Sequence, residues 1–152
     1  MSIAEIVEMH GNARENLIEI LHDIQDASED NSLHKQDLQT LSEIMGLTIS
    51  DLISTASFYT MFSLEPRGRH IVRLCESPPC YVMGSENLRD ALQNRLGVNI
   101  GETTEDGEFT LETTSCLGAC GVAPVMSVDD EVYGNLTEQK AREIIDSIAT
   151  QC

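Results

Sequence analysis

The hydrophobic pattern of the chain changes its period near residue 66, and this change predicts two structurally different parts. Before it, apolar residues recur at the spacing of amphipathic helices, as in the set Leu17, Ile20, Leu21 and Ile24. From His70 onwards the pattern turns to short alternating runs, "HIVRLC" and "EFTLETTSC", which are typical of strands. The breaker "EPRG" at 65–68 separates the two patterns. The sequence therefore predicts a helical domain over 1–65 and a second domain over 66–152.

Two further helices are expected in the first domain, after the one that carries Leu17. One ends at Gly46, which suits a left-handed cap. The other begins with the capping pattern Thr48-x-x-Asp51. The region before the first helix is short. Three residues at the end of the last helix are expected to pack in the core: Tyr59, Met61 and Phe62. The alternative is that they contact a partner protein.

The second domain is expected to form a small sheet covered by helices. A strand over "HIVRLC" is followed by "ESPPCYVMG", which we expect to be a loop because two prolines cannot both belong to a regular element. Ser85 is the expected cap of a helix that Gly97 ends, and "DG" at 106–107 predicts a tight turn. Strands are expected at "EFTLETTSC", "PVMSV" and "VYG", and Thr137 caps a final helix. The order is β-α-β-β-β-α, an α+β arrangement.

Four of the five cysteines form two pairs that are far apart in the sequence. Cys75 and Cys80 enclose four residues, and Cys116 and Cys120 enclose three. Each pair directly follows a predicted strand, so the two pairs can meet at one edge of a sheet. Cys152 is the last residue, and we leave it out of this site. Clustered cysteines in a cytosolic chain favour a metal or redox site over structural disulfides.

The spacing alone leaves three chemistries open. Structural zinc normally takes closer C-x2-C pairs. A 2Fe–2S cluster allows wider spacers, because each pair can serve one iron. The loop "CLGACG" has little side-chain bulk, so Gly118, Ala119 and Gly121 let backbone N–H groups approach a cluster. Thiol or disulfide chemistry is the third interpretation, although neither pair has the C-x-x-C spacing of a thioredoxin-type dithiol.

The charge of the chain excludes several partners. A net charge of −17 argues against nucleic acid and disfavours an anionic membrane. No apolar run reaches the length of a membrane span, and the N-terminus does not read as a secretory signal, so we expect a cytoplasmic protein without direct membrane insertion. Three of the nine basic residues lie close together in the sequence: Arg67, Arg69 and Arg73. They are either ordinary solvated positions or a local docking patch for a partner.

No substrate site is evident in the sequence. There is no glycine-rich dinucleotide fingerprint after a strand and no obvious His/Asp/Ser constellation. We therefore expect no substrate site in this chain. Its cysteines would instead serve a bound centre, with a zinc-binding interaction module as the alternative of a different class to a redox subunit.

The combined pattern resembles the thioredoxin-like 2Fe–2S ferredoxins over roughly residues 15–148. It consists of "ASFYTMFSLEPRGRH", the C-x4-C pair, a long gap and "CLGACGVAPVM", with "GETTEDGEFTLE" and "LTEQKAREIID" also similar. These are the 24-kDa-type (E-type) subunits of NADH:quinone oxidoreductase and their relatives in hydrogenases and formate dehydrogenases. The resemblance implies an N-terminal helical bundle followed by a thioredoxin-like domain. It also implies that one 2Fe–2S cluster is ligated by four cysteines: Cys75, Cys80, Cys116 and Cys120.

The same resemblance implies the partners. These are a 51-kDa-type flavoprotein subunit that carries FMN and the NAD(H) site, and further iron–sulfur subunits of the complex. The expected function is one-electron exchange with that FMN, in a subunit of an NAD(H)-dependent oxidoreductase. The short N-terminal region favours a soluble bifurcating hydrogenase-type assembly, with respiratory NADH:quinone oxidoreductase and NAD-dependent formate dehydrogenase as alternatives.

Two residues near the cysteines allow two interpretations each. Glu76 departs from the Thr-rich loop expected in the family, and its charge either lowers the potential of a neighbouring cluster or simply faces water. Pro124 stands just before a strand, where thioredoxin-like folds commonly hold a cis proline. The sequence leaves its isomer open.

Overall fold

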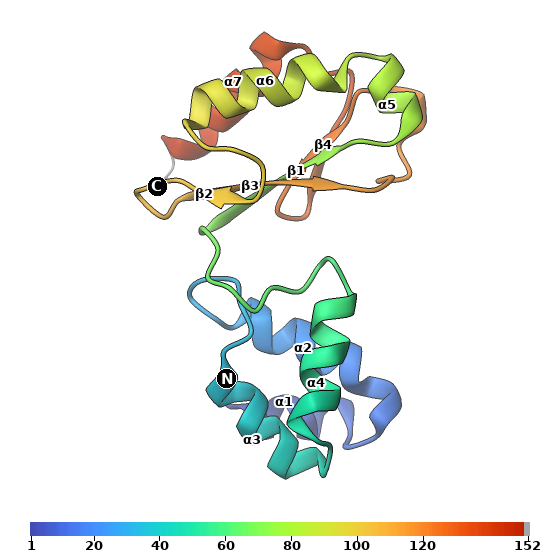
Figure 1. Ribbon diagram of the computed structural model, residues 1–152, viewed down its shortest axis with the longest axis vertical. Coiled ribbons are helices and arrows are strands. Elements are labelled where there is room, and N and C mark those ends of the chain that lie inside the picture. Colours follow the sequence, from blue (N-terminus) through green and yellow to red (C-terminus); the bar gives the residue numbers. More distant parts are fainter. Residues whose placement is uncertain (151–152) are drawn as a thin grey trace. The chain divides into compact units, whose positions relative to one another are not determined.

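The computed structural model describes residues 1–150, so Cys152 lies outside the described residues (Figure 1). The chain divides into two compact units, residues 1–67 and the residues from Gly68 onwards. Each unit has its own hydrophobic core. Within the described part of the chain, no helix is both long enough and apolar enough to span a membrane.

The first unit is helical. It contains α1 (Ile3–His10), α2 (Leu17–Asp26), α3 (Lys35–Met45) and α4 (Ile49–Phe58), with the short 3-10 turn η1 (Arg14–Asn16) before α2. The expected caps are confirmed: Gly46 ends α3 at φ 67°, and the Thr48 hydroxyl accepts from the Asp51 N–H at 3.1 Å. The side chains at the centre of the core come from all four helices and one connecting loop: Ile6, Ile20, Leu21, Leu33, Leu38, Leu41 and Leu52.

Helix α1 was not expected from the sequence. The Ser2 side chain accepts from the Glu5 N–H while the Glu5 carboxylate accepts from the Ser2 N–H, so a capping box starts the helix. Ile6 and Val7 are buried in the core, and Gly11 ends the helix at φ 86°. The region before Leu17 therefore contributes to the core of this unit.

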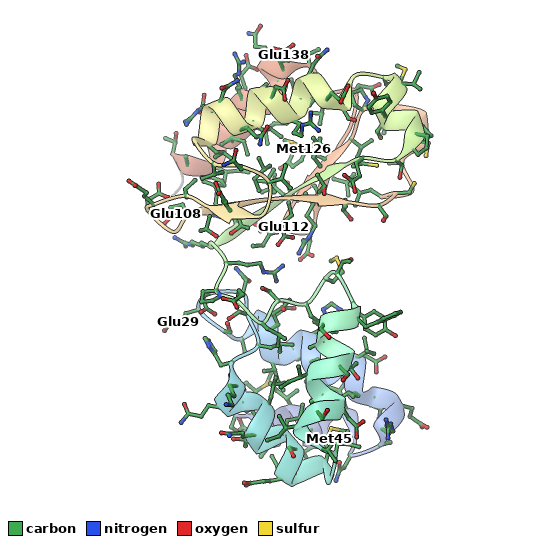
Figure 2. All side chains as sticks on the ribbon, in the orientation of Figure 1. Glu29, Met45, Glu108, Glu112, Met126 and Glu138 are labelled. Carbon is green, nitrogen blue, oxygen red and sulfur yellow. The ribbon has the colours of Figure 1, made fainter. Side chains whose placement is uncertain are left out.

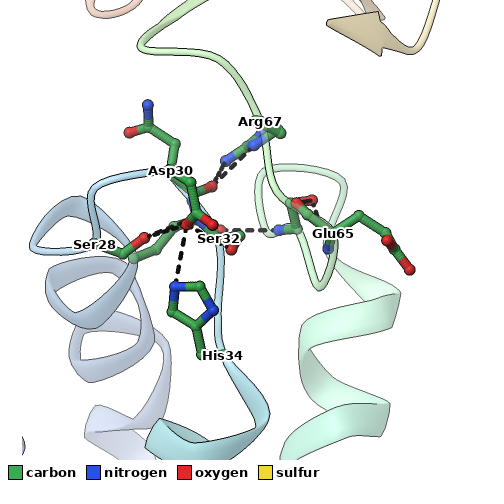
Figure 3. A network of polar contacts seen from close by, with 9 residues as sticks. Ser28, Asp30, Ser32, His34, Glu65 and Arg67 are labelled. Carbon is green, nitrogen blue, oxygen red and sulfur yellow. Dashed lines mark hydrogen bonds and ion pairs between the residues drawn. The ribbon is translucent and has the colours of Figure 1, made fainter. Parts of the chain in front are cut away.

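A polar network fixes the loop between α2 and α3 (Figure 3). One carboxylate oxygen of Asp30 accepts from the Ser28 and Ser32 hydroxyls at 2.7 and 2.8 Å and pairs with His34 Nε2 at 3.2 Å. Partial burial raises the pKa of Asp30, but these donors outweigh it and hold the pKa below its usual value. The Arg67 N–H donates to the Asp30 carbonyl at 2.8 Å, which ties the end of this unit to the same loop.

The second unit is a mixed five-stranded sheet in the order β2-β3-β1-β4-β5. The strands are β1 (His70–Cys75), β2 (Glu102–Thr103), β3 (Phe109–Thr114), β4 (Met126–Val128) and β5 (Glu131–Tyr133). β1 and β3 are parallel, and the other neighbours are antiparallel. Two long helices, α6 (Ser85–Leu96) and α7 (Glu138–Ala149), lie together on one face of the sheet in Figure 1. Met126 is fully buried in the core beneath them (Figure 2).

The predicted order of elements is confirmed with three differences. β2 is only two residues long and gave no signal in the sequence. Gly84, at φ 96°, occupies the N-cap of α6, while Ser85 is the first helical residue and is buried. The Thr137 cap of α7 is as expected, since its side chain accepts from the Lys140 N–H at 3.2 Å.

The third difference is α5 (Pro78–Val82), a short helix where we expected a loop. Pro78 and Pro79 occupy its first positions. The N–H groups at those positions have no partner within a helix, so a proline that lacks one costs little there, and its fixed φ suits the helix. The expectation was therefore wrong because it treated both prolines as interior residues.

Two groups of residues are placed differently from the predictions. Phe62 is buried, but Tyr59 and Met61 are 44% and 43% exposed, so the core-packing interpretation is wrong for those two. Arg67 and Arg73 are buried. Arg67 donates to the Asn31 carbonyl and Arg73 pairs with Glu112 at 3.3 Å. Both interpretations, ordinary solvated positions and a local docking patch, are therefore wrong for Arg67 and Arg73; Arg69 alone of the three is exposed.

Candidate metal centre

The sheet brings the two cysteine pairs to the same end. β1 and β3 run parallel with Cys75 opposite Thr114, so the segments that leave both strands start side by side. Cys75 is the last residue of β1, and Cys80 follows within α5. Cys116 lies two residues beyond β3, and Cys120 begins the 3-10 turn η2 (Cys120–Val122). This register explains how the ends of two neighbouring strands bring the two cysteine pairs to one end of the sheet, as the sequence predicted.

Backbone hydrogen bonds fix the end of β1 on both sides. The Cys75 N–H donates to the Val125 carbonyl at 3.1 Å, and the Glu76 N–H donates to the Thr114 carbonyl at 3.1 Å. The segment that leaves β3 and the segment that approaches β4 are thus both attached to the residues around Cys75. This arrangement limits the movement of the thiols relative to one another.

The four thiols differ in burial. Cys75 and Cys80 are both 2% exposed and form a small apolar cluster with Ala123 and Val125. Cys116 and Cys120 are exposed, and the four cysteines within residues 1–150 form no disulfide. The site therefore has an enclosed pair and a pair that faces the surface.

Hydrogen-bond donors around Cys75 favour its thiolate. Burial raises the pKa of the Cys75 thiol, but donors outweigh this effect and lower the pKa below its ordinary value. These donors are the backbone and side chain of Ser77, the Cys80 thiol and the Leu117 N–H. Since metal ligands must be deprotonated, this environment suits a coordinating sulfur.

The other two shifted thiols show that all four sulfurs share one electrostatic environment. Burial raises the pKa of Cys80, and the neighbouring Cys75 and Cys120 raise it further, against an opposing hydrogen bond from the backbone of Val125. The pKa of Cys120 is raised chiefly by its hydrogen bond with Cys116 and by the charge of Cys116, with a smaller contribution from Cys75. A bound cation would relieve this repulsion.

The distance within the Cys116–Cys120 pair fits tetrahedral thiolate ligation. Cys116 Sγ and Cys120 Sγ lie 3.6 Å apart. Two sulfurs on one tetrahedral ion at about 2.3 Å from it lie about 3.8 Å apart. Within residues 1–150, no three His, Cys, Asp or Glu side chains lie close enough together to hold a single metal ion. The donors are instead arranged as a Cys75–Cys80 pair and a Cys116–Cys120 pair, and two ligands for each iron is the arrangement that a 2Fe–2S cluster takes.

The loop around Cys116 places a backbone donor against a cysteine sulfur. Gly118 adopts φ 77°, and its N–H donates to Cys116 Sγ at 3.3 Å. A side chain at this φ would be strained, so glycine is favoured here. Gly121 does not adopt a left-handed φ. The Ala123–Pro124 bond, which the sequence left open, is cis.

Sequence reasoning missed a residue that holds η2 in place. A Cβ on Gly134, after β5, would lie 2.5 Å from Val122 Cγ2 and 2.9 Å from the Val122 carbonyl oxygen. That carbonyl accepts from the Asn135 N–H, so the backbones of the two segments are in direct contact. A lone glycine after a short strand gave no signal in the sequence, because the contact is made only in the folded chain.

Comparison with known proteins agrees with this architecture. A family model described as "Thioredoxin-like [2Fe-2S] ferredoxin" matches residues 3–149. The E-type subunit of NADH-quinone oxidoreductase from Mycobacterium tuberculosis strain H37Rv is 38% identical over 144 residues, which cover 95% of this chain and 56% of the relative. The E-type subunit from Buchnera aphidicola subsp. Baizongia pistaciae is 34% identical over 147 residues, which cover 97% of this chain and 85% of the relative. The chain thus spans about half the length of the mycobacterial relative.

A solved structure shares the fold over most of the chain. The NAD+-reducing [NiFe]-hydrogenase in its air-oxidised state contains a chain that matches with a TM-score of 0.79 at 24% identity. The match covers 90% of this chain and 23% of that one. Together with the family model, it confirms the α+β fold class expected from the sequence, in which N-terminal helices precede a thioredoxin-like mixed sheet.

Proposed function

Since the chain belongs to the thioredoxin-like [2Fe-2S] ferredoxin family, we propose that it is an electron-transfer subunit that holds one 2Fe–2S cluster on four cysteine ligands: Cys75, Cys80, Cys116 and Cys120. The observation that carries this proposal is the meeting of two thiol pairs from distant segments at one end of the sheet. A bound 2Fe–2S cluster supplies one-electron chemistry. The chain itself supplies thiolates, backbone donors to sulfur and an apolar cover over the Cys75–Cys80 pair.

The proposed electron donor is a flavoprotein subunit that carries FMN and oxidises NADH. Two of the relatives are named as subunits of NADH-quinone oxidoreductase, which supports a partner of this kind. Further iron–sulfur subunits would then accept the electron. On this account the chain contributes to an NAD(H)-dependent oxidoreductase without a substrate site of its own. We place it in the cytoplasm, because cysteines that hold a metal centre instead of forming disulfides are typical of a reducing compartment.

The parent complex is a separate question. The names of these relatives support respiratory NADH:quinone oxidoreductase. The bifurcating hydrogenase-type assembly rested on a short N-terminal region, which contains α1 and gives no evidence on the parent complex. The hydrogenase match supports a common fold only. We therefore favour the respiratory type, and keep the hydrogenase and the NAD-dependent formate dehydrogenase as candidates that the co-purifying subunits would distinguish.

The test is reduction by NADH in two samples. The tagged chain is purified without oxygen, alone and with the subunits that accompany it. NADH should bleach the visible absorption of the cluster only when the flavoprotein is present, whereas dithionite should bleach it in both samples. Bleaching of the isolated chain by NADH would contradict the absence of a substrate site. A colourless chain that contains one zinc ion would support the zinc-module alternative instead.

A further inference from the structure

The two thiol pairs differ in the structure that surrounds them. Cys75 is the last residue of β1 and Cys80 lies in α5, and both side chains are 2% exposed. Cys116 and Cys120, which we call the loop pair, are exposed, and residues 115–119 belong to no helix or strand. A reagent in solution can therefore reach the sulfurs of the loop pair, whereas the other pair is enclosed.

The loop pair is positioned for a bond between its two sulfurs. Cys116 Sγ and Cys120 Sγ lie 3.6 Å apart, and a disulfide bond is about 2.05 Å long, so an approach of about 1.5 Å would close it. Gly118 lies between the two cysteines, and a Cβ added to it would meet no atom of the described residues within 4 Å. The loop thus has room to adjust, and closing so short a ring costs little chain entropy.

Access to the sulfurs, and not the distance between them, distinguishes the two pairs. The Cys75 and Cys80 thiols are also close enough for a hydrogen bond between them. Their side chains, however, pack in an apolar cluster with Ala123 and Val125, and the Cys75 N–H donates to the Val125 carbonyl at 3.1 Å. Because access to the sulfur limits the rate of thiol–disulfide exchange, this cover protects the enclosed pair from an external disulfide.

We propose that Cys116 and Cys120 are a redox modification site, at which a reversible intramolecular disulfide forms in the chain before the cluster is loaded. One thiolate of the loop pair attacks an external disulfide, forms a mixed disulfide with it and releases one thiol of the reagent. The second thiolate of the loop pair displaces the other reagent thiol and closes the ring. The loop pair thereby loses two electrons and two protons, and the external disulfide is reduced to two thiols.

The disulfide would prevent loading of the cluster, and this consequence rests on the proposed function. Iron in a 2Fe–2S cluster is bound by cysteine thiolates, and two sulfurs that are joined to each other cannot serve as thiolate ligands. Once the cluster is loaded, the same two sulfurs are ligands and do not react with an external disulfide. The loop pair therefore confines cluster insertion to a chain that is kept reduced.

The test maps disulfides in the full chain after treatment with hydroxyethyl disulfide, a small neutral reagent that the net charge of −17 does not repel. All samples carry Cys152→Ser, so that the fifth thiol does not compete. The cluster is removed with a chelator and a reductant, the reductant is then removed without oxygen, and circular dichroism records the fold. After treatment, the remaining thiols are alkylated. Trypsin then places the two pairs in separate peptides, residues 74–89 and 96–140, for mass spectrometry.

Peptide 96–140 should lose two hydrogens and escape alkylation about tenfold faster than peptide 74–89, because burial shields the second peptide's thiols from the reagent. Cys116→Ser should leave a mixed disulfide on Cys120 in place of the closed disulfide. Cys75→Ser is the matched control and should keep the closed disulfide of the loop pair. A disulfide in peptide 74–89 that forms as fast, a link between the two peptides, or separate reagent adducts on both loop thiols would overturn the inference.

Cluster uptake separates this inference from the proposed function. The oxidised chain should take up no cluster from added iron and sulfide until a dithiol reductant opens the disulfide, and the cluster-loaded chain should resist the reagent. Cluster uptake by the oxidised chain would show that the disulfide does not control loading. A chain that forms the loop-pair disulfide but takes up no cluster even after reduction would support the modification site and refute the proposed function.

Discussion

Replacing Gly134 by alanine should disturb the thiol site from a position that holds no ligand. The added Cβ would lie 2.5 Å from Val122 Cγ2, 2.7 Å from Val122 Cβ and 2.9 Å from the Val122 carbonyl oxygen. Ordinary carbon contacts are about 3.5–4.0 Å, so the two segments must separate by about 1 Å. Because Val122 belongs to η2, which begins at Cys120, the displacement is transmitted to that thiol.

The size of the effect follows from the clash. Overpacking of this kind costs about 1–3 kcal/mol. For a unit of this size, each kcal/mol lowers the melting temperature by about 4–8 °C, so a loss of roughly 5–20 °C is expected. Val122→Ala in the Gly134→Ala background removes only the contact to Cγ2. The contacts to Cβ and the carbonyl oxygen remain, so rescue should be partial.

Gly68→Ala provides the matched control. A Cβ on Gly68 would lie 2.8 Å from the Phe109 backbone, a comparable clash at the opposite end of the sheet, where β1 and β3 begin. Both variants should melt earlier by circular dichroism. At a temperature where both are folded, only Gly134→Ala should have a lower iron content and an altered visible spectrum. Equal iron loss in both variants, or a wild-type melting temperature in Gly134→Ala, would refute the reasoning.

Three further perturbations test other parts of the account. Cys120→Ser should weaken or shift the visible spectrum of the cluster while the helical circular dichroism is largely kept, and Cys152→Ser should leave that spectrum unchanged. Glu76→Gln should raise the midpoint potential in a redox titration by about 20 mV, the effect of one charge roughly 8 Å away in water; an unchanged potential would mean that Glu76 only faces solvent. Asp30→Ala should lower the free energy of unfolding of the helical unit by about 1–2 kcal/mol in urea titrations near neutral pH. Because the folded pKa of Asp30 is lowered, this difference should be present above the ordinary Asp pKa of about 3.9 and should shrink as pH falls below it, and a difference that does not change with pH would contradict the role of the carboxylate.

The end of α3, the start of α4 and the thiol site could be predicted because their signals are local or follow from simple topology. Gly46 and Thr48 carry their own conformational and hydrogen-bonding preferences. The meeting of the cysteine pairs required only that each pair follow a strand of the same sheet, and β1 and β3 are neighbours. The resemblance supplied the chemistry that spacing alone left open.

The differences arise where the outcome depends on tertiary context. Pro78 and Pro79 are helix breakers in an interior but are favourable at a first turn, and the sequence does not say which applies. Tyr59 and Met61 have the composition of core residues, yet the helical core is filled without them. The contact between Gly134 and Val122 joins a loop residue to a residue of η2 that is distant in the sequence, and no local pattern encodes it.

The measurement that tests the central claim most directly is EPR spectroscopy of the anaerobically purified chain, together with iron and sulfide analysis. The account predicts two irons and two sulfides per chain, with no signal in the oxidised protein and a spin-one-half signal of one spin per chain after reduction by dithionite. The chain with the four proposed ligand cysteines replaced by serine should contain neither iron nor signal. A colourless wild-type protein, silent before and after reduction and loaded with zinc, would contradict the account.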